Sequence, residues 1–225
     1  TLETVLADLA ENDTAIQSFR STGAFFIETP ELGQRRFRGR IAYRRPADLY
    51  VRGDHQLGTR LFEMRCSGAD WWVEIPSESL LYHSGDTELA PRTSFSVSPM
   101  DIALEVFFQE DWTQHDTSTV RMVDFHPEEQ IVVLEMRRPQ GMRRRVELKG
   151  PPWTVASSAL FDWRGRTLAF TRRSDYRVID NIRFSTQIEA EFPRENARMR
   201  FALRRPVLNE ELDDSLFILD PAAPS

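Results

Sequence analysis

Alternating apolar and polar side chains mark residues 35–45 as a β-strand with two unlike faces. One face carries Phe37, Gly39, Ile41 and Tyr43. The other face is mostly arginine, and side chains of a strand point alternately to opposite faces. Residues 198–204 repeat this pattern. A sheet of such strands has one solvated, cationic face and one apolar face that must be covered.

Short strands of this kind recur along the chain, separated by glycine, proline, aspartate and asparagine, which is typical of an all-β domain. The predicted strands are 24–29, 35–45, 48–52, 59–66, 71–75, 80–83, 117–125, 130–137, 143–148, 156–162, 167–173, 181–192 and 198–204. A sheet with so many strands must curl or pair with another. No repeat or shift in composition divides the chain, so we expect one domain over 1–219 and a frayed tail over 220–225.

Two helices are predicted. Residues 2–20 show helical spacing of apolar positions, with a break near Asn12. Residues 99–110 follow a capping serine, begin with Pro99 and are apolar nearly all round, which favours a buried helix. The fold class is therefore α+β: a strongly bent antiparallel sheet with helices on its concave side.

Composition excludes some functions. The net charge of −6 argues against general nucleic-acid binding. Lys149 is the only lysine, so the positive charge is arginine, which suits phosphate or carboxylate but also reflects codon preference. No apolar run is long enough to span a membrane. The chain starts at Thr1 without a signal peptide, so we expect that any targeting segment has been removed.

The sequence predicts no catalytic, metal or cofactor site. Cys66 is alone and is expected to be a buried core thiol. The four histidines are His55, His83, His115 and His126, and no two have metal-ligand spacing. No nucleophile elbow or phosphate loop occurs, which leaves an unrecognised hydrolase as a remote alternative. Of Trp71 and Trp72, strand geometry places one inside, and we assign Trp72 to the interior.

Several motifs, in order, resemble the periplasmic lipoprotein-carrier superfamily of the LolA and LolB type. They are a strand with a central Gly39 that ends in Arg45-Pro46, the stretch 68–76, the apolar helix 99–110, the motif 162–165 and the end 208–217. The resemblance covers almost the whole chain. It implies an unclosed β-barrel (a half-barrel) with a helical lid, 99–110, over a cavity for acyl chains of lipoproteins or related lipids.

The resemblance also implies roles for particular residues. Arg45 matches the arginine that reaches toward the lid, and lid gating is assigned to Arg45, Pro99 and Met100. The expected ligand cavity consists of Phe37, Ile41, Tyr43, Phe62, Met64, Trp72, Ile102, Val106, Phe184, Ile188, Met199 and Phe201. Leu57 could take the place of the exposed apolar loop residue of the receptor-type member.

The expected function is non-enzymatic binding of a lipid or an acylated lipoprotein, for carriage or localisation in the cell envelope. The protein would be a monomer in the periplasm or at the outer membrane, bound peripherally or by a lipid anchor, with an envelope protein as a further partner. Two alternatives stay open, both with a filled barrel: a lipid-anchored structural or interaction lipoprotein, and an envelope sensor domain.

Overall fold

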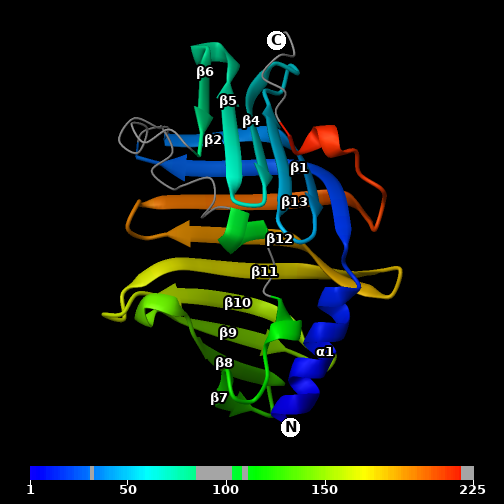
Figure 1. Cartoon of the computed structure of the whole chain (residues 1–225), viewed down its shortest axis with the longest axis vertical. Helices are drawn as coiled ribbons and strands as arrows, with labels where there is room; N and C mark the ends of the chain where they lie inside the picture. Colours follow the sequence, from blue (N-terminus) through cyan, green and yellow to red (C-terminus); the bar gives the residue numbers. More distant parts are fainter. Residues whose placement is uncertain (31–32, 85–102, 108–110, 219–225) are drawn as a thin grey trace.

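A computed structural model describes residues 1–30, 33–84, 103–107 and 111–218. Within these residues, thirteen strands form one antiparallel sheet in the order β6-β5-β4-β3-β2-β1-β13-β12-β11-β10-β9-β8-β7 (Figure 1). Strands β6 and β7 are the two edges of this sheet and do not pair with each other within the described residues, so the barrel is unclosed. Figure 1 shows β4, β5 and β6 running across the direction of β7 to β13, as the sheet twists and curls.

The elements follow one another closely along the chain. The strands are β1 (Ser18–Thr29), β2 (Gly33–Arg44), β3 (Asp48–Asp54), β4 (Arg60–Ser67), β5 (Asp70–Ile75), β6 (Leu80–His83), β7 (Val120–His126), β8 (Ile131–Arg137), β9 (Arg143–Lys149), β10 (Thr154–Phe161), β11 (Thr167–Ile179), β12 (Ile182–Phe192) and β13 (Ala197–Leu208). The helical elements are α1 (Leu2–Thr14), η1 (Pro76–Glu78), η2 (Ala103–Phe107), η3 (Trp112–Gln114), η4 (Pro139–Gly141) and η5 (Asp214–Leu216).

Helix α1 ends at Thr14, so the predicted helix over 2–20 was too long. The apolar residues beyond it belong to the sheet: Phe19 lies in β1 between Tyr43 of β2 and Leu208 of β13. Strand pairing on both sides satisfies the backbone of β1, which outweighs the helical spacing of Phe19. The predicted lid helix, 99–110, is described only at Ala103–Phe107, where η2 forms; its other residues lie outside the described part.

Two apolar clusters lie on the concave side. The larger joins β1 to β5 and β11 to β13 with Val106 and Phe107 of η2. The smaller packs Val5, Leu6 and Leu9 of α1 on β7, β8 and β9. Gly39 belongs to the larger cluster's floor, because a Cβ there would lie 2.1 Å from the ring of Phe25. None of the described helices is long and apolar enough to cross a membrane.

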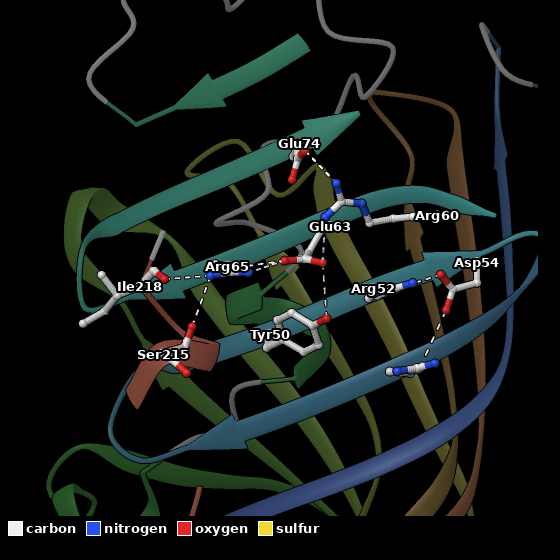
Figure 2. A network of polar contacts seen from close by, with 10 residues as sticks. Tyr50, Arg52, Asp54, Arg60, Glu63, Arg65, Glu74, Ser215 and Ile218 are labelled. Carbon is white, nitrogen blue, oxygen red and sulfur yellow. Dashed lines mark hydrogen bonds and ion pairs between the residues drawn. The ribbon is translucent and has the colours of Figure 1, made fainter. Parts of the chain in front are cut away.

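The outer face of the sheet is partly covered by the C-terminal segment. Glu63 of β4 is 5% exposed and accepts from Tyr50, Arg60 and Arg65 (Figure 2). Arg65 also donates to the carbonyl oxygens of Ser215 and Ile218, at 3.1 and 2.7 Å. These contacts hold the segment that follows β13 against β3 and β4.

Arg44 helps to hold the same segment. Its guanidinium lies 4.8 Å from the ring centroid of Phe217 and pairs with Asp48 and Asp214. The cationic face of β2 is therefore more than a solvated surface at this end, because Phe217 is fully buried on it.

Candidate ligand-binding site

The concave face brings most of the predicted cavity residues together. The larger cluster contains Phe37, Ile41, Tyr43, Met64, Val106, Phe184, Ile188, Met199 and Phe201, with Phe62 packed at its margin. Each of the nine is at most 5% exposed. Ile102, like Pro99 and Met100, lies outside the described residues. Alternation thus predicted that the strand residues among these nine share a face, although they come from four strands.

Trp72 was assigned to the wrong face. Trp71 packs against the larger cluster together with Val73. Trp72 points the other way, opposite Arg65 of β4, and its ring lies 5.3 Å from that of His83. Alternation within β5 carried the signal, since Trp71 shares its face with the buried Val73 and Ile75, whereas Trp72 shares the opposite face with Glu74. The pairing of Met64 with Val73 agrees with this assignment.

Segment η2 fills the middle of this face. Val106 is fully buried and Phe107 is 2% exposed. The ring of Phe107 lies 4.8 Å from that of Phe201, which is also 5.0 Å from Phe25. In the described residues the concave core is thus closely packed, so an acyl chain would have to displace η2 or occupy space beside it.

Such space exists at one end of the larger cluster. A cavity of about 360 Å³, here called the end pocket, opens there. Its apolar wall is formed by Leu160, Leu168, Ala169 and Phe192. Arg138 and Arg194 also line it, and the Arg144–Glu105 ion pair, 2.6 Å long, lies where it adjoins the interior. An apolar wall with charged groups at its margin suits an amphiphile.

A second, smaller cavity of about 50 Å³ adjoins the smaller apolar cluster and is here called the polar chamber. Its charged and hydroxyl lining includes Asp13, Glu105, Arg144, Thr171, Arg173 and Arg183. Sequence reasoning missed it. Strand parity carried a signal, since Arg144 shares a face with Val146 and Leu148, and Arg173 shares one with Ala169.

Arg45 contacts the end of α1. Its guanidinium donates to the carbonyl oxygens of Ile16 and Asp13, at 2.9 and 3.1 Å, and pairs with the Asp13 carboxylate at 2.5 Å. Asp13 is 2% exposed. Burial raises the pKa of the Asp13 carboxyl, and Arg45 opposes that rise. Gating by Arg45 stays a prediction, because its expected partners Pro99 and Met100 are not described.

The histidine, cysteine, aspartate and glutamate side chains of the described residues form no group of three that could hold a metal ion. Cys66 is fully buried, as predicted, and burial raises the pKa of its thiol to about 12. A thiol in this state is protonated at neutral pH and is a poor nucleophile.

Alkaline pH is expected to destabilise the protein well before pH 12. Burial raises the pKa of Tyr43, Cys66 and Tyr176 to about 12 in each case. In the unfolded chain these groups ionise near 10 (Tyr) and 8.5 (Cys). The unfolded state therefore loses protons first, and the free energy of unfolding falls as the pH rises from about 8.5 toward 12. Urea unfolding at about pH 8, 10 and 11 measures this; a constant value would contradict it.

Together the curled open sheet, its apolar concave face and the N-terminal helix define an unclosed barrel of the LolA-like class. No family model and no curated protein sequence matches the chain. Solved structures do share its fold. A DUF1329 family protein from Desulfovibrio piger has a TM-score of 0.67 and 18% identity, covering 96% of this chain and 95% of that one.

Two further structures agree. A putative outer membrane lipoprotein-sorting protein domain from Vibrio parahaemolyticus has a TM-score of 0.65 and 11% identity, over 96% of this chain and 97% of that one. A LolA superfamily protein from Nitrosomonas europaea has a TM-score of 0.64 and 17% identity, over 97% and 98%. At these identities the likeness shows a LolA-like fold over nearly the whole length of each chain.

Proposed function

We propose that this protein binds a lipid, or the acyl chains of a lipoprotein, without catalysis. The observation that carries the proposal is the apolar concave face of an open sheet, continuous with the end pocket. Burial of an acyl chain contributes about 0.8 kcal/mol per CH₂. The lipoprotein-sorting domain and the LolA superfamily protein of the same fold support a role in carriage or localisation.

We infer that the protein acts as a monomer in the cell envelope, in the periplasm or at the outer membrane, and the two structures of the same fold support an envelope location. An acyl chain enters through the end pocket and extends along the concave face where Val106 and Phe107 now pack. The predicted cavity residues of β2, β4, β12 and β13 then contact the chain, and Arg45 influences its release through the end of α1.

The direct test is native mass spectrometry of gently purified protein, joined to titration with a dansyl-labelled fatty acid. Co-purified lipid and saturable, blue-shifted fluorescence are the expected results, since the probe brightens on leaving water. A ligand-free mass together with no saturable binding would refute the proposal.

A bulky side chain in the end pocket is expected to weaken binding. Leu168 lines that pocket from β11. Leu168→Trp should raise the Kd of the labelled fatty acid about tenfold, because excluding two CH₂ groups removes roughly 1.6 kcal/mol. The matched control is Val178→Trp on the same strand, where the native side chain is 71% exposed. Equal affinities of the two variants for the labelled fatty acid would show that its acyl chain does not occupy the end pocket.

The close packing of the described concave residues favours one alternative, a filled barrel. Val106 and Phe201 are at most 3% exposed and belong to one apolar cluster, as in an ordinary core. A filled core of this kind is sufficient for a lipid-anchored structural or interaction lipoprotein, or for an envelope sensor domain, because neither has to hold a lipid inside the barrel. The binding titration separates the two functions, because a filled barrel gives no saturable signal with the labelled fatty acid.

A further inference from the structure

The polar chamber is lined by three arginines, Arg144, Arg173 and Arg183, and by two carboxylates, Asp13 and Glu105. Arg144 pairs with Glu105 at 2.6 Å, and Arg183 pairs with Asp8 at 3.0 Å. The carboxylate of Asp13 is taken by Arg45 from outside the chamber. Each of these charges therefore has an opposite charge in contact. Arg173 is left over.

Arg173 lies on the inner face of β11, two residues beyond Thr171. Its guanidinium donates to the Val106 carbonyl oxygen at 2.8 Å. No carboxylate of the described residues lies within ion-pair distance of it. Arg173 lines the chamber, and burial lowers the pKa of its guanidinium. A cation in such a place is costly unless an anion offsets its charge.

Hydroxyl groups stand beside this cation. Thr171 is 3% exposed and Ser158 is 8% exposed, and the two are direct cross-strand neighbours on β11 and β10. Ser158 accepts from Arg144 at 3.3 Å, which leaves its own proton to donate. The Thr171 hydroxyl makes no hydrogen bond within the described residues. A chamber of about 50 Å³ has room for roughly three or four water molecules, at 10–15 Å³ each.

We propose that the polar chamber binds an oxyanion, a carboxylate or phosphate group, which Arg173 neutralises and to which Thr171 and Ser158 donate hydrogen bonds. Charge-assisted hydrogen bonds of this kind are the strong ones. Arg144 and Glu105 line both the chamber and the end pocket, so an anionic head group in the chamber would lie next to an acyl chain in the pocket. This head-group reading rests on the proposed function. A free oxyanion is the other source of the same chemistry.

The test uses the full chain and two probes. Inorganic phosphate, added at constant ionic strength, should raise the Tm of the wild type. Palmitate should bind at least about tenfold more tightly than hexadecanol, which has the same chain without the charge. Arg173→Gln should lose both effects. Arg172→Gln is the matched control, since Arg172 is exposed on the opposite face of the same strand and should keep both.

The outcomes separate the sources. A preference for palmitate that depends on Arg173 assigns the site to a lipid head group. A phosphate effect that depends on Arg173, with palmitate and hexadecanol binding equally, assigns it to a free oxyanion. Absence of both effects in the wild type, or their survival in Arg173→Gln, overturns the proposal. If neither palmitate nor hexadecanol binds, the proposed function is contradicted. The effect of phosphate on the Tm still tests whether the chamber binds an oxyanion.

Arg173→Gln is expected to fold, because it removes a buried charge that has no carboxylate of the described residues in direct contact; its Tm without phosphate should equal or exceed that of the wild type. If it does not fold, Thr171→Val carries the same test. That variant keeps the shape and removes one donor, so it should retain the phosphate effect and the palmitate preference only in part. Full retention would overturn the part assigned to Thr171.

Discussion

Phe201→Ala is expected to lower the free energy of unfolding by about 3–5 kcal/mol. Phe201 is 3% exposed and lies between Phe25 and Phe107, with ring centroids at 5.0 and 4.8 Å. Removing its ring leaves a cavity bounded by β1, β13 and η2, which rigid strands cannot close. In a protein of this size, the Tm should fall by roughly 10 °C.

Chemical unfolding followed by circular dichroism measures the change. Phe125→Ala is the matched control: it removes the same ring from β7, where Phe125 is 53% exposed, and should cost less than about 1 kcal/mol. Similar losses for the two variants would show that the concave core is not closed around Phe201. If Phe201→Ala is less stable than the wild type only when lipid has been removed from both proteins, a bound ligand supplies part of that packing.

Local patterns predicted much of this fold because they depend on neighbouring residues only. Alternation and turn residues together located the strands of the described sheet, although β1 begins six residues before its predicted start. Alternation also sorted Phe37, Ile41 and Met199 onto the face that the larger cluster buries. It failed where two periodicities overlap: Phe19 fits a helix after Ile16 and equally fits a strand with Phe25. Strand pairing decided between them, and pairing is not visible in the local sequence.

Features that join distant segments were beyond prediction. The sheet places the first strand beside the last, with Phe25 opposite Phe201, so both halves of the chain must fold before the larger cluster exists. The polar chamber arises in the same way, from α1, η2, η3 and the strands β9 to β12. A polar residue on an inner face, such as Arg173, indicates a site of this kind. The residues that surround it can be named only once the order of the strands in the sheet is known.

The ion pair between Arg45 and Asp13 is the second place where a single change should have a large effect. Asp13→Asn leaves the Arg45 guanidinium, 21% exposed, without its opposite charge, and is expected to cost about 3–5 kcal/mol. Glu210→Gln is the control, because Glu210 pairs with Arg20 at an exposed site and should cost no more than about 1 kcal/mol. Urea unfolding at neutral pH measures both.

Replacing both partners separates pairing from burial. Burial raises the pKa of Asp13 against the influence of Arg45, so the desolvated charges offset much of their own attraction. The double variant Asp13→Leu/Arg45→Met should therefore recover most of the stability lost by Asp13→Asn. A double variant as unstable as the single one would mean that the bonds from Arg45 to the carbonyl oxygens of Asp13 and Ile16 matter more than the charge.

The same variants test whether Arg45 gates the ligand. Its described contacts fix the end of α1, which borders both the polar chamber and the larger cluster. If Arg45 acts only through α1, the change in the dissociation rate of a labelled fatty acid should follow the stability that each variant loses. Arg45→Met and Asp13→Asn should then lie on the same line when rate is plotted against stability. If Arg45 also holds the lid, Arg45→Met should release the ligand faster than Asp13→Asn does. An unchanged rate in both variants would end the gating hypothesis and leave Arg45 as the residue that anchors the N-terminal helix to the sheet.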